Sequence, residues 1–397
     1  MRRNLMTGET ITVVGGGLAG LVAAIECAEG GARVRLLEAS RGLGGRARTL
    51  GGPYRANLGA HVIYADGFSW RWLRERRILP PAPRGPLRGL RFYYGGRARR
   101  VPPAAFLGVR KLRGREAPHD VDFRTWASEI AGEETAEAIS RAAVVFAFDH
   151  DPGRLSAAFV KENGARVLGF PPAARYVVGG WERLVGALAG RARELGVVIE
   201  TGTRVRHLPE PPVVVATRLE EARALLGDES VRWEGTRCAV LEVGLRGRRG
   251  DAFAVVDLDS GSWVERFTAP DPSLAPPGHE LVQGHTGLAP GEPLEEGVRR
   301  LETVFDGTFS GWRGRETWRR RMGMEHLTGA VDPPGTTWRD RPAVERGGGV
   351  FLAGDQVAAP GLLSEVSFAS ASRAAAGALA WGQYQGRKRV PSPRLAR

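Results

Sequence analysis

Three glycines and one acidic residue near the N-terminus have the types and spacing that phosphate binding requires. Gly15, Gly17 and Gly20 form a GxGxxG motif, and Glu38 follows 18 positions after the last of them. In such a motif the first glycine permits a tight turn, the second lets the backbone approach a pyrophosphate, and the third lets a helix pack closely. A helix that begins at this turn attracts phosphates through its free N–H groups. Because the Glu38 carboxylate would bind ribose hydroxyls and repel the 2′-phosphate of NADP, the motif predicts NAD or FAD.

The sequence around the motif predicts the elements that would position these residues. Residues 11–14 form a short β-branched run, residues 21–29 are predicted to be a helix, and residues 33–37 a second strand that ends at Glu38. A strand, a glycine turn, a helix, a second strand and a terminal acid thus follow one another within about 30 residues, the βαβ context that a dinucleotide-binding motif needs.

A second glycine pair follows the predicted ribose-binding acid. The segment SRGLGGRARTL, residues 40–50, contains Gly44, Gly45 and Arg46. Its position just after the second strand would bring these residues back over the same pyrophosphate. With a GxGxxG motif, a strand-ending Glu and a GGR motif in this order, the sequence resembles the flavoprotein superfamily of amine oxidases, protoporphyrinogen oxidases and phytoene-type desaturases.

Three later segments extend this resemblance: residues 57–64 (NLGAHVIY), residues 177–205 and residues 350–375. The resemblance implies bound FAD, with residues 57–64 beside the isoalloxazine ring, Val205 against the adenine and Asp355 on the ribityl chain. It also implies that the last helix points its N-terminus at the flavin, where it would stabilise the negative charge of the reduced ring. The cofactor contacts implied in this way are Gly15, Gly17, Leu18, Ala19, Gly20, Glu38, Ala39, Gly44, Gly45, Arg46, Gly59, Ala60, His61, Val205, Gly354, Asp355, Leu362 and Leu363.

In the rest of the chain, segments with clear helix and strand patterns alternate with segments that show no βαβ pattern. The regular blocks predict a helix over residues 181–195, paired strands over 197–200 and 203–208, a buried strand over 213–216, a strand over 350–355 and a helix over 362–381. We therefore expect an α/β fold with a discontinuous Rossmann-like FAD-binding domain and an inserted α+β substrate domain. The predicted boundaries are 8–75, 175–235 and 345–385 for the FAD-binding domain, 76–174 and 236–344 for the substrate-binding domain, and 386–397 for a mobile basic tail.

Departures from the amine-oxidase pattern indicate which branch of the superfamily the chain resembles more. Amine oxidases usually surround the amine with aromatic rings, one of them a Tyr at the position of Leu362. Many also place a lysine near flavin N5, and none of Lys111, Lys161 and Lys388 lies in a segment where it is expected. Residues 269–283 either resemble a stretch of phytoene-type desaturases or form an ordinary loop before a strand.

The resemblance therefore implies an FAD-dependent oxidoreductase that takes a hydride from a lipophilic small molecule onto flavin N5, as phytoene desaturases and protoporphyrinogen oxidases do. The alternatives are a flavin amine oxidase, a non-redox isomerase or mutase, and a protein that keeps FAD as a structural element. Because the chain has a single GxGxxG motif in a strand–turn–helix context, we expect no separate NAD(P)H domain. Electrons would then leave to oxygen, a quinone or another carrier.

The residues assign no catalytic base. His61 lies in a segment expected beside the ring, but a lone histidine more often has a structural role. The remaining candidate histidines fall in expected loops or strands of the substrate domain: His150, His285 and His326. Four aromatic residues either line an apolar pocket or belong to the core: Trp263, Phe267, Trp312 and Trp318.

Composition and charge limit the remaining classes of function. The net charge of +13 comes almost entirely from scattered arginines with no basic stripe interleaved with aromatic residues, so we expect no nucleic-acid binding. Two cysteines cannot form a zinc cage or a disulfide framework, and the chain shows neither a signal peptide nor a membrane span. We expect a cytoplasmic protein without a metal, whose basic surface and tail leave peripheral contact with anionic lipid open.

Overall fold

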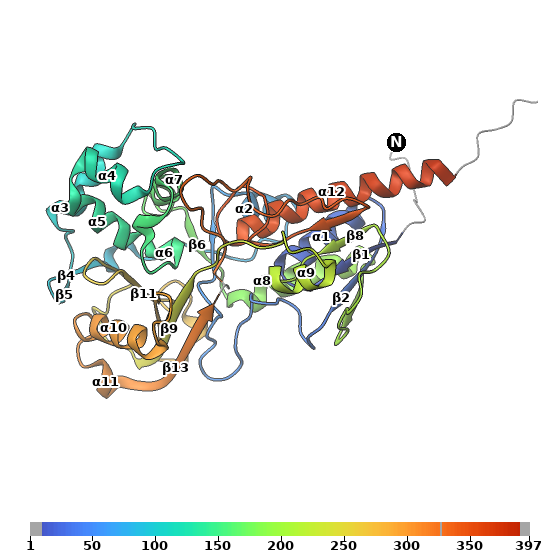
Figure 1. Ribbon diagram of the computed structural model, residues 1–397. Helices are drawn as coiled ribbons and strands as arrows, with labels where there is room; N and C mark the ends of the chain where they lie inside the picture. The colour runs from blue at the N-terminus through green and yellow to red at the C-terminus, as the bar shows by residue number, and fades with distance from the viewer. Residues whose placement is uncertain (1–9, 326–327, 390–397) are drawn as a thin grey trace, which may run out of the picture.

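The computed structural model describes residues 10–325 and 328–389. Two large sheets organise the molecule, a five-stranded one on the right of Figure 1 and a seven-stranded one on the left. Among the described residues, no helix combines the length and the apolar character that crossing a membrane would need. The predicted mobile tail is in part helical, because the last helix continues to Arg389, and residues 390–397 lie outside the described part.

The five-stranded sheet is parallel and has the strand order β14-β8-β1-β2-β7. Strand β8 is a continuous valine run that is buried on both faces, as expected for a parallel sheet covered by helices, whereas β2 alternates exposed arginines with buried Val34 and Leu36. Val13 and Val214, on neighbouring strands, are completely buried. The strands are β1 (Thr10–Val14), β2 (Arg33–Glu38), β7 (Val198–Thr201), β8 (Val213–Val215) and β14 (Val350–Leu352).

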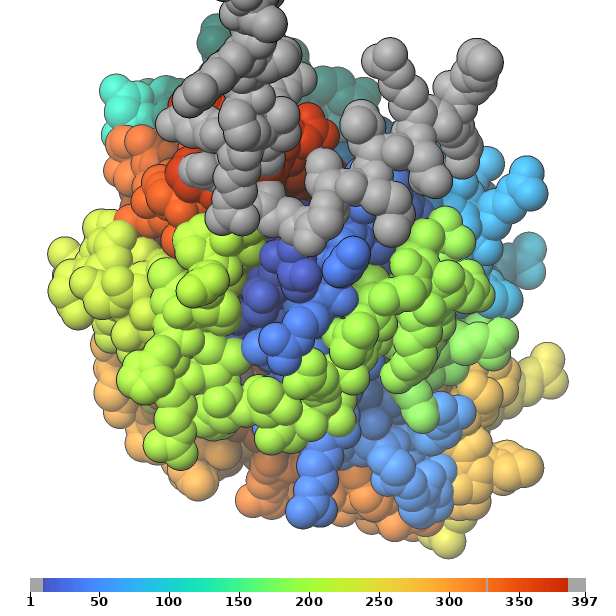
Figure 2. Space-filling model, turned by 90° about the vertical axis from the view of Figure 1, so that its right-hand side faces the viewer, coloured from blue at the N-terminus to red at the C-terminus, as the bar shows by residue number. Residues whose placement is uncertain are grey.

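Helices from distant parts of the sequence complete this half of the molecule. Helix α1 packs against both α8 and the long α12, and its Leu21 and Ile25 side chains are fully buried. Figure 2 views this end and shows the blue N-terminal segment between two green ones, which correspond to the β8 and β7 sides of the sheet. The helices are α1 (Leu18–Glu29), α2 (Phe68–Glu75), α8 (Gly180–Glu194), α9 (Leu219–Leu226) and α12 (Ser364–Arg389).

The βαβ unit predicted at the N-terminus is confirmed, and α1 begins at Leu18, three residues before the predicted start. The paired strands predicted over residues 197–200 and 203–208 are wrong in one respect. Strand β7 pairs with β2, and residues 203–208 form no strand. The reason is a contact between segments far apart in the sequence: the Thr203 N–H donates to the carbonyl of Glu38, at the end of β2.

The seven-stranded sheet has the order β13-β9-β12-β11-β10-β4-β5, and only the β10–β4 pair is parallel. Helix α10 covers one face through Val298, Leu301 and Phe305, whose spacing puts all three on one side of the helix. The strands and this helix are β4 (Leu90–Tyr94), β5 (Arg97–Arg99), β9 (Arg237–Arg246), β10 (Ala254–Asp257), β11 (Ser262–Arg266), β12 (His279–Gly287), β13 (Glu316–Glu325) and α10 (Leu294–Asp306).

A group of mostly short helices lies at the upper left of Figure 1, above this sheet. A two-stranded ribbon, β3 (Val62–Tyr64) with β6 (Ala174–Tyr176), joins the chain segments that enter and leave this group. The remaining helices are α3 (Ala104–Leu107), α4 (Phe123–Ala131), α5 (Glu133–Ala142), α6 (Val144–Ala147), α7 (Ala157–Val167) and α11 (Trp312–Arg315), with 3₁₀ turns η1 (Leu87–Gly89), η2 (Gly108–Leu112), η3 (Pro152–Arg154) and η4 (Pro272–Leu274).

The predicted fold class, a Rossmann-like α/β domain with an inserted α+β domain, is confirmed. Every strand of the parallel sheet falls within the segments assigned to the nucleotide domain, and every strand of the seven-stranded sheet falls within the two segments assigned to the insertion. The domain boundaries themselves remain a proposal.

Candidate cofactor-binding site

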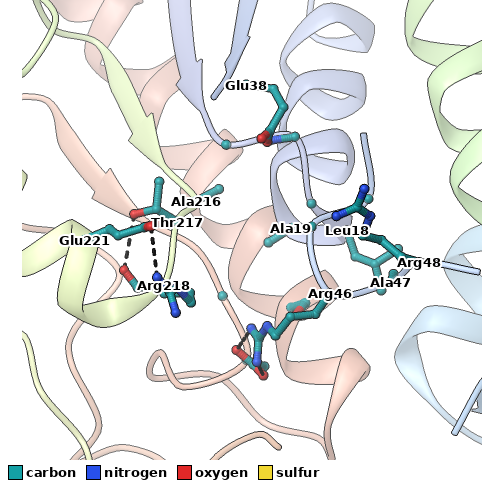
Figure 3. A pocket seen from close by; sticks show the side chains of 18 of the residues that line it. Leu18, Ala19, Glu38, Arg46, Ala47, Arg48, Ala216, Thr217, Arg218 and Glu221 are labelled. Carbon is teal, nitrogen blue, oxygen red and sulfur yellow. Dashed lines mark hydrogen bonds and ion pairs between the residues drawn. The ribbon is translucent and has the colours of Figure 1, made fainter. Parts of the chain in front are cut away.

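A cavity of about 640 Å³ opens at the carboxyl ends of the parallel strands. Val14, Glu38 and Ala216 line it at or just after the ends of β1, β2 and β8, and the start of α1 faces it. Ligands of open parallel sheets bind in this place, because the loops that leave adjacent strands diverge there. Figure 3 shows Glu38 at one end, Arg46 at the other, and Leu18 and Ala19 between them.

Fifteen of the eighteen residues that the sequence resemblance implied line this cavity. Segments as far apart in the sequence as the first glycine turn and the last helix are thereby brought to one site. The fifteen are Gly15, Gly17, Leu18, Ala19, Glu38, Ala39, Gly44, Gly45, Arg46, Gly59, Ala60, Val205, Gly354, Asp355 and Leu363.

The glycine turn has the geometry of an anion-binding site. Gly15 has φ +107°, and a Cβ there would lie 2.5 Å from the carbonyl oxygen of Ala216. A Cβ on Gly20 would lie 1.8 Å from the carbonyl oxygen of Gly15, so only glycine lets α1 pack on the turn. Gly17, by contrast, has its nearest heavy atom, Gly44 O, 3.9 Å from an ideal Cβ, and it caps α1 without a side-chain hydrogen bond. The first turn of α1 therefore presents N–H groups and open space to a ligand.

The Glu38 carboxylate is held in place at the rim of the cavity. Its Oε2 accepts a hydrogen bond of 2.6 Å from the Gly16 N–H, and its Oε1 accepts two of 2.7 Å from the Ser40 N–H and hydroxyl. Three donors fix the orientation of the acid, and a carboxylate oxygen has further lone pairs for a ligand hydroxyl. This arrangement suits the ribose-binding role predicted for Glu38.

At the other end of the cavity, Arg46 and Asp355 form a two-pronged ion pair. Both guanidinium-to-carboxylate distances are 2.6 Å (Figure 3). The pair connects the GGR loop to the end of β14, 309 positions later in the chain. The neighbouring Gly354 N–H donates to the Ser370 hydroxyl at 2.9 Å, which ties the same loop to α12.

Several lining residues were not identified from the sequence. The segment after β8 contributes Ala216, Thr217 and Arg218, and α9 contributes Glu221. Since β8 was predicted as a buried parallel strand, the rule that ligands bind beyond strand ends could have identified this segment. No comparable signal exists for the lining residues from the inserted segments: Phe148, Met324, Thr328 and Gly329.

Three implied contacts do not line the cavity, each for a structural reason. Gly20 packs behind the turn against Gly15. Leu362 is 2 % exposed and belongs to the apolar cluster of the helical group. His61 is completely buried against the Phe267 ring, with centroids 4.7 Å apart, and neither of its ring nitrogens has a hydrogen-bond partner. Burial lowers the pKa of His61 to about 4, so the ring is neutral at pH 7.

Among the described residues, the other histidines and the aromatic residues considered from the sequence do not line the cavity either. His285 is buried on β12, stacked on Phe148 with ring centroids 4.6 Å apart, and His326 lies outside the described residues. His150 is exposed and lies beside Asp149. Trp312 and Phe267 belong to apolar clusters, and Trp263 and Trp318 pack against one of these clusters, which favours the core interpretation for all four.

We expect His61→Leu to stabilise the protein, and more so at acidic pH. Because the folded pKa is depressed from 6.5 to about 4, the unfolded chain binds a proton that the folded protein excludes, and stability falls as the pH drops below about 6.5. Leucine removes this loss, which is roughly 2 kcal/mol at pH 5 and close to zero at pH 7.5. Thermal midpoints of both proteins at the two pH values measure the difference. A gain that does not grow on acidification would show that His61 is not a buried neutral ring.

Comparisons with known proteins agree with this geometry. A family profile described as an NAD(P)-binding Rossmann-like domain matches residues 13–75. No curated protein matches the sequence. Among solved structures, the chain resembles an oxidoreductase from Methanosarcina mazei, with a TM-score of 0.74 at 17% identity, over 92% of this chain and 99% of the other.

Two further structures broaden the chemistry represented by this fold. Cyclohexylamine oxidase from Brevibacterium oxydans has a TM-score of 0.73 at 15% identity, over 94% of this chain and 99% of the other. A reduced UDP-galactopyranose mutase has a TM-score of 0.68 at 13% identity, over 94% and 96%. The chain therefore has the two-domain fold of the amine-oxidase type, and the resemblance inferred from sequence is confirmed at the level of the fold.

Proposed function

We propose that the protein is an FAD-dependent oxidoreductase that takes a hydride from a lipophilic small molecule. The observation that carries the proposal is the convergence of fifteen residues, from four separate sequence segments, on one cavity. The first turn of α1 would hold the pyrophosphate, Glu38 the adenosine ribose, and Val205 the adenine. FAD fits better than NAD because the cavity continues past the glycine turn to Arg46, Asp355 and the start of α12.

When bound, FAD would supply a two-electron acceptor, and the chain supplies binding, orientation and charge. Ser364 and Ser367, at the start of α12, line the far end of the cavity. In the proposed binding mode the positive end of the α12 dipole would face the place where negative charge develops on reduction. Leu363 precedes the helix with φ +53°, a conformation that aliphatic residues rarely adopt, and it lines the cavity.

The lipophilic character of the substrate is supported by the side chains at this end. Phe148, Met324 and Leu363 line the cavity and pack in one apolar cluster with Cys238 and Val240. No lysine, histidine or tyrosine lines the cavity among the described residues. The described lining therefore has two aromatic side chains, Phe148 and Trp181, and lacks the lysine and the tyrosine expected of an amine oxidase.

The second candidate is a flavoenzyme without net redox turnover. The structural similarity to a mutase of the same fold supports this alternative. The two candidates differ in whether an electron acceptor is needed. A desaturase or dehydrogenase must pass electrons to oxygen, a quinone or another carrier on each turnover, whereas an isomerase or mutase keeps them.

The test is spectroscopic. We expect the purified protein to show the two absorption bands of a bound flavin and to release FAD on denaturation. Under anaerobic conditions, polyenes or porphyrinogens should bleach the oxidised flavin and amines should not, with reoxidation by oxygen or a quinone completing the cycle. Steady turnover without an electron acceptor would instead support an isomerase or a mutase. A colourless protein that does not take up added FAD would refute the proposal.

A further inference from the structure

One surface segment of the insertion combines an unusual density of positive charge with an absence of negative charge. Residues 97–115 comprise β5, α3, η2 and the turns that join them. The segment has no acidic residue and seven basic ones: Arg97, Arg99, Arg100, Arg110, Lys111, Arg113 and Arg115. Figure 1 shows β5 and α3 at the left end of the molecule, far from β1 and from the end of α12 on the right.

The charges of this segment are not neutralised by the protein. Arg99 lies over the Tyr94 ring, and in the described part of the chain no ion pair involves any of the other six basic residues. Elsewhere in the described part of the chain, many arginines form ion pairs with acidic side chains, as Arg124 does with Asp151. Burial and the nearby charge of Arg100 together lower the pKa of Arg91, which extends the uncompensated positive region to β4.

The same segment exposes aliphatic side chains. Val101 is 66% exposed, Leu107 41% and Val109 40%. The segment is nevertheless firmly attached, because Phe106 packs on the Phe92 ring with centroids 5.5 Å apart, and Leu112 is buried in the helical group. Phe106 and Leu112 thus anchor the segment to the protein, while Leu107 and Val109 remain exposed to solvent.

We propose that residues 97–115 dock the protein on an anionic lipid surface. The six unpaired cations would contact lipid headgroups, and Val101, Leu107 and Val109 would enter the boundary between headgroups and acyl chains. Aliphatic side chains favour lipid over single-stranded nucleic acid, which would be met by stacking aromatic rings. This docking surface lies outside the cofactor cavity, and the proposal does not rest on the proposed enzymatic function.

The experiment is co-flotation of the FAD-supplemented protein with lipid vesicles. One vesicle type contains phosphatidylcholine alone, and the other contains about 30% phosphatidylglycerol, which gives it the negative surface charge of an anionic leaflet. We expect binding only to the anionic vesicles, with a strong decrease at higher salt. Two variants test the surface separately: Val101→Asp with Leu107→Asp and Val109→Asp, and Arg100→Gln with Arg110→Gln and Arg113→Gln. Each should lower the bound fraction about tenfold.

Matched controls change the same properties elsewhere. Val198→Asp alters an aliphatic residue that is 54% exposed on β7, and Arg33→Gln with Arg74→Gln and Arg206→Gln removes three exposed cations from the nucleotide half. Both controls should float like the parent, and thermal midpoints show whether each variant is folded. Equal binding to both vesicle types, equal loss in test and control variants, or binding that disappears only when residues 386–397 are deleted would overturn the proposal.

Discussion

Gly17→Asp is expected to weaken FAD binding at least about 100-fold without destabilising the fold. An ideal Cβ at Gly17 meets no heavy atom closer than 3.9 Å, and the backbone there has φ −76°, which any residue adopts. Aspartate is also a preferred residue at a helix N-cap, so the unliganded protein should be at least as stable as the parent. The new carboxylate would occupy the space and the N–H groups proposed for the pyrophosphate and repel its charge. We expect the Kd for FAD to rise at least about 100-fold, or about 2.8 kcal/mol.

Quenching of flavin fluorescence during titration of the unliganded protein measures this Kd. Gly186→Asp is the matched control, because Gly186 is exposed on α8 with nothing within 4 Å of an ideal Cβ. It should bind FAD like the parent. Parental affinity in Gly17→Asp would mean that the glycine turn does not hold the cofactor.

The second large effect is expected from Glu242→Ala, because it leaves the partly buried Arg320 without its charge partner. Glu242 is 1% exposed and accepts hydrogen bonds from Arg320 and, at 2.6 Å, from Gln283. Both donors also approach the carbonyl of Asn57, which precedes the cavity-lining residues 58–60. Removing one partner of a buried pair costs about 3–5 kcal/mol. We expect the thermal midpoint to fall by roughly 5–10 °C, and FAD to bind more weakly.

Two controls separate the lost charge partner from lost packing. Glu242→Met combined with Arg320→Met removes both charges, and it should recover most of the stability, since apolar replacements of buried pairs are often neutral. Glu200→Ala breaks the more exposed pair with Arg35 and should cost less than about 1 kcal/mol. If the double variant is as unstable as Glu242→Ala, the pair is not the cause of the loss.

How much of the site could be anticipated depends on the range of the forces involved. The turn from Gly15 to Gly20 and the acid at Glu38 were identifiable because glycine conformation and strand-to-helix spacing are local properties. Residues 203–208 misled the prediction because the course of the chain there depends on a distant segment: the Thr203 N–H donates to the Glu38 carbonyl at the end of the neighbouring strand β2. His61 misled it because proximity in sequence to Gly59 and Ala60 does not specify the face on which a side chain lies.

The amino-acid sequence was sufficient to predict the Rossmann-like half and to bring fifteen of the eighteen implied residues to one cavity, because these depend on short motifs whose steric requirements are met within a few residues. The apolar end of the cavity depended on the tertiary structure. Phe148 and Met324 reach it from separate parts of the insertion, and the Arg46–Asp355 pair closes over 309 positions of chain. Such contacts form when packing brings distant segments together, and burial then determines which side chains face the ligand and which are excluded from it.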